Sequence, residues 1–388
     1  MIIATLKEIK NNENRVGLTP YGAAELVKAG HRLIVQQTAG IGSGFSDTEY
    51  KEAGAEIMKN PEDIVKVAEI LVKVKEPLPS EYNLLEQFAG KTLFTYLHLS
   101  GVDKRLTKVL TNNNITAIAY ETVQDERGLL PLLAPMSEIA GVLAVQYGAE
   151  YLQKKYGGRG VTLGRITGTN SAHVVVMGGG FVGMTAAKTA AGMGSLVKLF
   201  DISQARVDTL NKEVKEYLGP TLGKNFEAIV PKGENLNDAL KEANLLVGAV
   251  LVAGAKAPEV VTEEQIKKMK EGSVVVDVSI DQGGCIWGSR GTSHSEPTYE
   301  IYGKIYCCVP NMPGQVSRQS TMALTNATLP YLKMIAKNGA EALLKSSVAG
   351  DGRFARGLNT YKGFITYESV AKDLGVMDQY KPVAELLA

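Results

Sequence analysis

The segment from His173 to Asp201 constrains the fold of this chain more than any other part of it. It opens with a short apolar run at 174–177, which is typical of a strand buried on both faces of a parallel sheet. A glycine-rich turn, an alanine-rich helical stretch and a second apolar run at 196–200 follow without interruption. The segment therefore predicts strand, tight turn, helix and strand in one βαβ unit.

Three glycines of the turn, Gly178, Gly180 and Gly183, have the spacing GxGxxG. In a dinucleotide site the first glycine permits the tight turn, the second lets the backbone approach a pyrophosphate, and the third lets the helix pack against its strand. The unpaired amides and the dipole at the helix N-terminus attract the phosphates. The spacing is weak by itself, but its position between strand and helix favours a dinucleotide site over an ordinary packed βαβ unit.

Asp201 ends the second strand, close to the distance of about 20 residues at which dinucleotide sites carry an acidic residue. Its carboxylate can accept hydrogen bonds from an adenosine ribose and would repel a 2′-phosphate. We therefore expect NAD rather than NADP as the cofactor. Arg206, which follows nearby, leaves NADP open as the alternative.

Composition describes an ordinary globular protein and excludes several functional classes. The 388 residues suggest two or three domains, and 42 Lys and Arg against 41 Asp and Glu leave a net charge of +1. This balance gives no electrostatic footprint for nucleic acid or for an acidic membrane. We expect neither a signal peptide nor a membrane span. Three cysteines cannot form a disulfide framework, so we expect a cytoplasmic protein.

Strands and helices alternate along the chain, which predicts an α/β fold. Apolar strands are predicted at 2–6, 32–37, 70–74, 92–97, 115–120, 228–230, 245–250, 274–278 and 304–309. Thr19 is expected to cap a helix that begins at Pro20, and Thr262 to open a capping box. A small-residue loop at 252–258 could lie close to a nucleotide.

The order of these elements predicts two domains. Residues 135–309 hold a complete doubly wound Rossmann domain for NAD, which begins with a long helix that Ser137 could cap. Residues 1–134 form a second α/β domain for the substrate. The last segment has too little strand pattern for a third domain, so we expect 310–388 to pack on the first. The nucleotide domain is then an insertion, and a cleft is expected between the two domains.

A site that transfers a hydride from a small polar substrate needs a cation for a carboxylate and a group that handles protons. Arg15 lies in a polar loop and its planar guanidinium suits a carboxylate, although a solvated surface arginine fits equally. Lys75 ends an apolar strand and could polarise a carbonyl oxygen, although an exposed strand-end lysine is commoner. His98 also ends an apolar strand, where a histidine suits acid–base chemistry or serves as a hydrogen-bonded core residue.

Three more candidates follow strands of the second domain. Asp281 comes after the fifth strand, where active-site groups collect, and a turn-forming aspartate before two glycines is the alternative. Asn311 and Met312 follow the sixth strand and could touch the nicotinamide or cap a loop. No metal site is expected, because HExxH and CxxC spacings are missing. A cysteine nucleophile is disfavoured because Cys307 and Cys308 fall in a predicted strand.

Sequence blocks from one end of the chain to the other are together far more specific than the glycine spacing. They include KEIKNNENRVGLTP, LVKVKEPLP, LFTYLHL, PMSEIAG, VVVDVSIDQGG and NMPGQVSR. In content and order they resemble the family of NAD-dependent L-alanine dehydrogenases and the nucleotide-binding subunit of transhydrogenase. The resemblance implies a two-domain subunit, usually a homohexamer, that oxidises L-alanine reversibly to pyruvate and ammonium. One segment departs from the family pattern, since GRITGTNSAH at 164–173 replaces a GVPGV block.

The resemblance also implies roles at matching positions. Arg15 would hold the alanine carboxylate and Lys75 would stabilise the developing carbonyl oxygen while hydride leaves Cα. Water then attacks the iminium, and a carbinolamine collapses to pyruvate and ammonium. His98 or Asp281 would take the proton of the water, and the division between them stays open. The implied nucleotide contacts are Ser137, Asp201, Asn311 and Met312.

Two related kinds of protein share the two-domain plan. One is the nucleotide-binding subunit of transhydrogenase, and the other is the opine-type enzymes, which reductively join pyruvate to an amino acid. The KEIKNNENRV, YLHL and IDQGG blocks favour the dehydrogenase over both. A module that binds NAD without catalysis is the alternative from another class, and the polar groups at strand ends argue against it.

Overall fold

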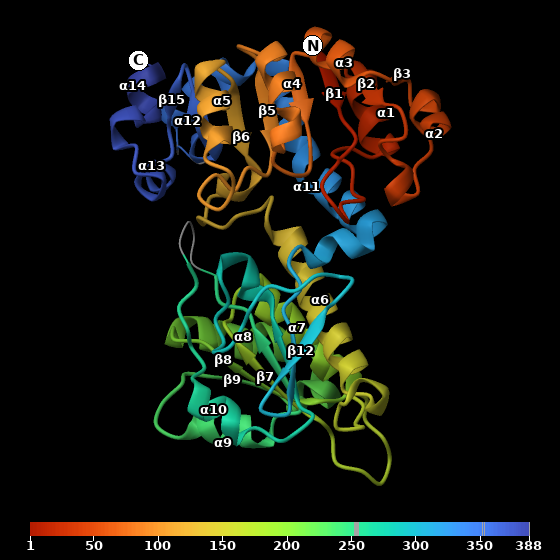
Figure 1. The fold of residues 1–388 in the computed structure, drawn as a ribbon, viewed down its shortest axis with the longest axis vertical. Coiled ribbons are helices and arrows are strands. Elements are labelled where there is room, and N and C mark those ends of the chain that lie inside the picture. Colours follow the sequence, from red (N-terminus) through yellow and green to blue (C-terminus); the bar gives the residue numbers. More distant parts are fainter. Residues whose placement is uncertain (252–255, 351, 353, 388) are drawn as a thin grey trace. The chain divides into compact units, whose positions relative to one another are not determined.

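The computed structural model describes residues 1–388 except 252–255, 351, 353 and 388. The chain divides into two compact units, of which the first comprises 1–136 with 314–388 and the second comprises 137–313. The N-terminal and C-terminal segments, red and blue in Figure 1, both belong to the first unit. The second unit is therefore an insertion in the first.

The first unit is built on an eight-stranded sheet in the order β15-β14-β6-β5-β4-β1-β2-β3. Six strands are parallel, and β14 and β15 extend the β6 edge antiparallel. Their bounds are β1 Ile2–Thr5, β2 Arg32–Gln36, β3 Glu56–Met58, β4 Ile70–Val72, β5 Thr92–Thr95, β6 Thr116–Ala119, β14 Leu358–Tyr361 and β15 Phe364–Ile365. The sequence predicted five of these strands and missed β3, β14 and β15, which are short or only partly apolar.

Helices pack against this sheet, and its central strands β4, β5 and β6 are buried on both faces. Ala4, Leu71 and Leu93 are paired across β1, β4 and β5 and belong to a core cluster completed by residues of α3, α4, α5 and α13. The predicted cap of α1 is confirmed, because the Thr19 side chain accepts from the backbone N–H of Gly22. The helices are α1 Pro20–Lys28, α2 Asp47–Glu52, α3 Pro61–Val67, α4 Tyr82–Gln87, α5 Arg105–Asn112, α11 Ser317–Asn338, α12 Ala340–Ala349, α13 Glu368–Leu374 and α14 Val383–Leu387.

The register of the central strands aligns their carboxyl ends at one edge of the sheet. Thr5 of β1 pairs with Val72 of β4, and Thr95 of β5 pairs with Ala119 of β6. The loops that leave these four strands therefore emerge side by side. Parallel α/β sheets bind ligands at this edge, so the fold points to the loops that carry the candidate side chains.

The second unit has a seven-stranded sheet in the order β12-β13-β11-β10-β7-β8-β9. The strands are β7 His173–Met177, β8 Leu196–Phe200, β9 Phe226–Ile229, β10 Leu245–Gly248, β11 Val274–Asp277, β12 Thr298–Ile301 and β13 Lys304–Cys307. The six parallel strands have the 3-2-1-4-5-6 order of a doubly wound dinucleotide fold, and β12 adds an antiparallel edge. The predicted α/β class with a Rossmann unit is confirmed.

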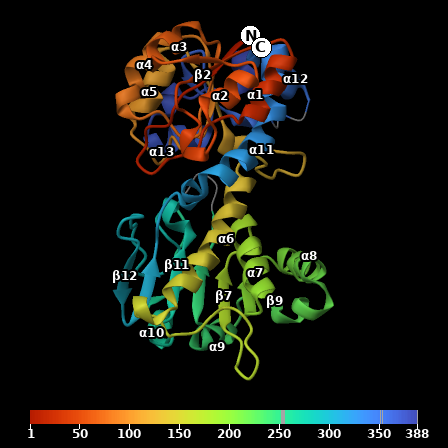
Figure 2. The same ribbon diagram turned by 90° about the vertical axis from the view of Figure 1, so that its right-hand side faces the viewer.

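Helices cover both faces of the second sheet (Figure 2). They are α6 Ala134–Tyr151, α7 Phe181–Met193, α8 Gln204–Leu222, α9 Asn235–Glu242 and α10 Glu263–Lys268. The predicted capping box is present, since Gln265 accepts from the Thr262 amide at 2.9 Å. The prediction that Ser137 caps α6 is wrong, because the helix already begins at Ala134 and Ser137 lies inside it.

The atypical loop at 164–173 lies at the amino edge of this sheet. It leads directly into the first residue of β7, whereas the glycine turn leaves the other end of that strand. The Arg165 amide donates to the Met193 carbonyl at the far end of α7, at 3.2 Å. The departure from the family block is therefore remote from the glycine turn.

Candidate functional site

Arg15 lies in the loop after β1 with 2% of its surface exposed, so it is not a solvated surface arginine. Its Nε and Nη2 atoms donate to Glu13 Oε1 and Oε2 at 2.7 and 2.5 Å, and Nη1 lies 3.1 Å from Met136 Sδ. Burial by itself lowers the Arg15 pKa, but the hydrogen bonds and charge of Glu13 outweigh burial and raise it. The guanidinium stays charged and is held in one plane, and a planar guanidinium suits a carboxylate.

Lys75 is half-buried beyond the end of β4. Glu8, from the loop after β1, accepts the backbone N–H groups of Val74 at 2.7 Å and of Lys75 at 3.3 Å. The Thr95 hydroxyl donates to the Lys75 carbonyl at 3.1 Å. Neighbouring elements thus fix the backbone on both sides of Lys75, which is built into the carboxyl edge of the sheet.

Glu76, next to Lys75 in the chain, is a buried carboxylate at the carboxyl edge of the sheet. It is 4% exposed, its Oε1 accepts from Lys10 Nζ at 2.6 Å, and its Oε2 is buried without a hydrogen-bond partner among the described residues. Burial by itself raises the Glu76 pKa, but the charges of Lys75, Lys10 and His98 lower it on balance. The charges of Lys75 and His98 thus both favour the ionised form of Glu76.

His98 lies beyond β5, which ends at Thr95 and not at 97 as predicted. Its backbone φ is +48°, in the left-handed region that residues other than glycine rarely adopt. The imidazole stacks on Tyr96, with ring centroids 5.6 Å apart and planes inclined by 4°. The side chain is 39% exposed, so it is not a core histidine and can meet a proton donor or acceptor.

The glycine turn of the second unit fits a dinucleotide phosphate. Gly178 has φ +100°, which requires glycine, and a Cβ on Gly183 would lie 1.9 Å from the Gly178 carbonyl oxygen. Around Gly180, in contrast, the space that a Cβ would occupy is open. Gly180 is the N-cap of α7 and supplies no side chain to the first amides of that helix. An anion can therefore approach these amides.

Asp201 and Arg206 hold the peptide groups of Gly179 from two sides. Asp201 Oδ2 accepts from the Gly179 amide at 2.8 Å, and Oδ1 accepts from the Ser203 amide at 2.9 Å. Arg206 Nε donates to the Gly179 carbonyl at 2.7 Å. The acidic residue therefore lies next to the glycine turn and orders it, as the acidic residue after the second strand of a dinucleotide-binding fold is expected to lie.

Asp281 lies in the 3₁₀ helix η6 (Val278–Gln282), which follows β11, and its side chain is exposed. The buried aspartate of this region is Asp277, whose Oδ2 accepts from the amide of Cys285 at 2.8 Å and from the Ser289 hydroxyl at 2.7 Å. Asp277 thus shapes the loop around η6. Asp281 lies at the surface of its unit.

The remaining candidates lie near the junctions of the two units along the chain. Ser137 is in the first turns of α6, Asn311 has φ +54°, and Met312 is 2% exposed at the start of the 3₁₀ helix η7 (Met312–Val316). Of the predicted small-residue loop at 252–258, residues 252–255 lie outside the described part of the chain.

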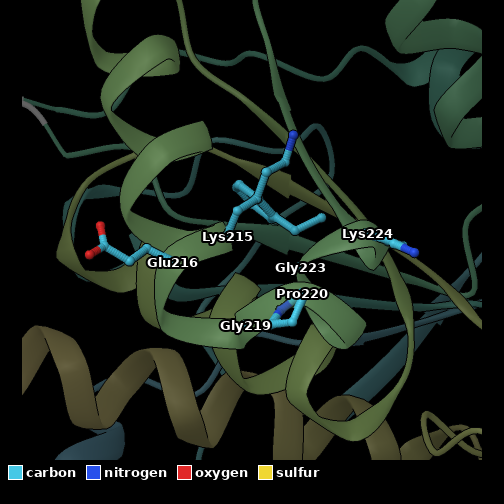
Figure 3. Close-up of a pocket in the computed structure, with 7 residues that line it drawn as sticks. Lys215, Glu216, Gly219, Pro220, Gly223 and Lys224 are labelled. Carbon is cyan, nitrogen blue, oxygen red and sulfur yellow. The ribbon is translucent and has the colours of Figure 1, made fainter.

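A cavity of about 560 Å³ lies elsewhere in the second unit, where α8 is interrupted at Gly219 and Pro220 (Figure 3). Phe226, the first residue of β9, lines it, so it lies at the amino edge of the sheet and not at the glycine turn. Its charged lining residues include Lys215 and Lys224. Among the residues that the structure describes, no group of three or more His, Cys, Asp or Glu could hold a metal ion.

Three glutamates, Glu8, Glu13 and Glu121, accept hydrogen bonds from the candidate residues Lys75, Arg15 and His98. No role for them was predicted from the sequence. Each stands in a loop or turn at the carboxyl edge and accepts hydrogen bonds from backbone amides there. The only sequence signal was their place just after a strand or, for Glu13, two residues before an arginine. That pattern does not distinguish them from solvated glutamates.

Comparisons with known proteins cover nearly the whole chain. The family profile "Alanine dehydrogenase/PNT, N-terminal domain" matches residues 4–140, and "Alanine dehydrogenase/PNT, C-terminal domain" matches residues 144–368. This chain belongs to the alanine dehydrogenase/PNT family. Each candidate substrate residue lies in the N-terminal match, and the glycine turn lies in the C-terminal match.

Full-length relatives within the alanine dehydrogenase/PNT family include three named alanine dehydrogenase. That of Methanococcus maripaludis is 48% identical over 96% of both chains. That of Mycolicibacterium smegmatis is 47% identical over 100% of both, and that of Bacillus subtilis is 47% identical over 100% of this chain and 98% of the relative.

Solved structures agree with this family. An L-alanine dehydrogenase superposes with a TM-score of 0.88 and 44% identity, covering 97% of this chain and 99% of that chain. A transhydrogenase from Sinorhizobium meliloti superposes with a TM-score of 0.78 at 22% identity, over 94% of this chain and 100% of that one. The second likeness shows the shared fold alone.

Proposed function

We propose that this chain is an NAD-dependent L-alanine dehydrogenase, which converts L-alanine, NAD⁺ and water reversibly to pyruvate, ammonium, NADH and a proton. The observation that carries the proposal is the 44–48% identity to alanine dehydrogenases over essentially the whole chain. The carboxyl edge of the first unit supports it independently, because it presents a buried arginine, a half-buried lysine and an accessible histidine.

Arg15 and Lys75 are assigned to substrate binding. Arg15 binds the alanine carboxylate, while Glu13 keeps the guanidinium plane in place through Nε and Nη2. Lys75 stabilises negative charge on the oxygen that becomes the pyruvate carbonyl. Its backbone, fixed by Glu8 and Thr95, limits how far the ammonium can move.

The cofactor is assigned to the glycine turn of the second unit. NAD, when bound, accepts the hydride that leaves Cα of alanine. The α7 amides behind Gly180 would hold its pyrophosphate, and Asp201 would accept hydrogen bonds from its adenosine ribose. The carboxylate of Asp201 disfavours a 2′-phosphate, which supports NAD over NADP.

His98 and Asp281 are assigned to proton transfer. After hydride loss, one of them takes a proton from the water that attacks the iminium carbon, and the carbinolamine then loses ammonia. The chemistry allows either His98 or Asp281 to take the proton of the water. We also propose a cytoplasmic homohexamer, as the family resemblance implies. In the described part of the chain, none of the helices has the length and apolarity that crossing a membrane requires.

Purified protein incubated with L-alanine and NAD is expected to produce NADH absorbance, and pyruvate with ammonium is expected to consume NADH. NADH oxidation that requires pyruvate together with ornithine or lysine, and that ammonium cannot support, would establish the opine activity instead. NAD binding without turnover of either substrate set would leave the non-catalytic module. Replacement of NAD by NADP is expected to lower kcat/KM by at least about tenfold.

A further inference from the structure

The backbone of His98 is held in a conformation that it would not adopt by itself. Its φ of +48° is costly for a residue with a Cβ, and the surrounding structure has to impose it. The strain occurs at the residue assigned to proton transfer. A group that holds His98 in this conformation therefore also decides where its imidazole lies.

The carboxylate of Glu121 stabilises this conformation of His98. It lies in the 3₁₀ turn η3 (Tyr120–Thr122) directly after β6, the neighbour of β5, so the parallel register brings it beside His98. Glu121 Oε1 accepts from the His98 amide at 2.6 Å and from the Leu97 amide at 3.2 Å, and Oε2 also lies 3.2 Å from the Leu97 amide. Two consecutive amides beyond the end of β5 are thus paired with one carboxylate.

The imidazole is positioned by the backbone and by Tyr96. Tyr96 is 3% exposed, and its hydroxyl donates to the Leu132 carbonyl at 2.6 Å, so its ring is a fixed platform for the parallel His98 ring. The distance from His98 Nδ1 to Glu121 Oε1 is 3.9 Å, beyond hydrogen-bond reach. Glu121 therefore acts mainly on the amide of His98 and only weakly on its ring.

We propose that Glu121 is a positioning residue, which holds His98 in its left-handed conformation through the His98 and Leu97 amides and so keeps the imidazole on Tyr96 for proton transfer. The inference rests on the proposed role of His98 in alanine oxidation. It makes a specific distinction, because an acceptor oxygen at this position is sufficient and a negative charge is not required. Glu121→Gln keeps the acceptor, whereas Glu121→Ala removes it.

A double-mutant cycle with His98→Ala tests whether Glu121 acts through His98. We expect His98→Ala to lower kcat by about 100-fold or more. Glu121→Ala is expected to lower kcat about tenfold with a near-normal KM for alanine, whereas Glu121→Gln stays within about threefold of the wild type. In the His98→Ala background, Glu121→Ala is expected to lower kcat no further. Additive losses, or equal losses in the Gln and Ala variants, would overturn the proposal.

A matched control comes from the opposite edge of the same sheet. Glu69 Oε2 accepts the backbone N–H of Ile2 at 2.5 Å, so Glu69→Ala also removes a carboxylate that pairs with a strand amide. It is expected to lower Tm without changing kcat. If Glu121→Ala behaves in the same way, its role is structural and the inference is wrong.

A second measurement does not depend on turnover. Reaction of His98 with diethyl pyrocarbonate, followed by mass spectrometry of the modified peptide, reports the placement of the ring. We expect modification several-fold faster in Glu121→Ala and unchanged in Glu121→Gln, because only the first variant frees the ring from Tyr96. An unchanged rate in Glu121→Ala would contradict the inference even if wild-type protein does not oxidise alanine, whereas wild-type inactivity alone contradicts the proposed function.

Discussion

Arg15 uses one edge of its guanidinium on Glu13, and both residues are almost fully buried. A buried ion pair of this kind contributes little to stability when compared with apolar residues of the same size. Its geometry is better explained by function, because the pair fixes a charged, planar group of the kind that binds carboxylates. A lysine ammonium cannot reproduce the planar two-point bridge that Arg15 makes to Glu13.

We therefore expect Arg15→Lys to lower kcat/KM for L-alanine by about 100-fold, mainly through KM, and to leave the NAD dissociation constant unchanged. Steady-state kinetics and NAD titration by fluorescence separate the two effects. Arg32→Lys is the control, because Arg32 makes the same two-point bridge to Glu56, at 2.7 Å for each bond, on an exposed surface. A normal KM for alanine in Arg15→Lys would remove Arg15 from the substrate site.

The position of a polar residue after an apolar strand predicted some residues of the candidate site and missed others. Arg15 was predicted because it lies in a polar loop after the first strand, and Lys75 and His98 because each ends an apolar strand. The structure places all three in loops beyond the carboxyl ends of β1, β4 and β5. Glu13 and Glu121 were not assigned, because a glutamate near a strand end is usually solvated. Only tertiary pairing shows that their oxygens accept hydrogen bonds from groups of the site.

At the scale of an element, α7 and its glycine turn are the part that the sequence described best. The three glycines have distinct physical reasons, which are a positive φ at Gly178, open space at Gly180 and close helix packing at Gly183. A methyl group at Gly183 would collide with the carbonyl oxygen of Gly178, and backbone on both sides leaves little freedom to relieve the contact.

Gly183→Ala is accordingly expected to weaken NAD binding by at least about tenfold and to lower Tm by several degrees. Gly192→Ala, in the same helix, is the control, since a Cβ there meets nothing within 4 Å. Alanine at this position should stabilise the protein by about 0.5–1 kcal/mol and leave NAD affinity unchanged. Calorimetric NAD titration and thermal melts measure both, and wild-type affinity in Gly183→Ala would contradict the assignment of the turn.

Element ends were predicted less well than element centres. The predicted strand at 92–97 ends at Thr95, because the amides of Leu97 and His98 pair with the Glu121 carboxylate and not with a neighbouring strand. Helix α6 begins at Ala134, so a serine that resembles an N-cap lies inside it. Strand β14 pairs antiparallel with β6 across a long sequence separation, which no local pattern announces.

At the scale of the whole molecule, the three cysteines are probes of folding, because all of them are buried in the second unit. Cys285, Cys307 and Cys308 are buried and unpaired with one another. Burial raises the pKa of the Cys285 and Cys307 thiols to about 12, and burial also raises that of Cys308. Protonated thiols shielded from solvent react slowly, which also argues against a cysteine nucleophile.

We expect Ellman's reagent at pH 8 to label none of the thiols in native protein and all 3 after unfolding in urea. The raised pKa values keep the thiols protonated at this pH, well below 12. Rapid stoichiometric labelling of native protein, assigned by peptide mass, would show that the second unit opens readily and would contradict the burial. Labelling with and without NAD also measures how much the cofactor stabilises that unit.

The sequence by itself determined the α/β class, the βαβ unit with its acidic residue and the family, because these depend on periodicity, glycine spacing and ordered blocks along the chain. It also named the cations and the histidine of the candidate site. Only the tertiary structure decided what holds them. The partners of Arg15, Lys75 and His98 include carboxylates from neighbouring loops, such as Glu8 and Glu121, and these meet through the register of a parallel sheet, which no local pattern encodes.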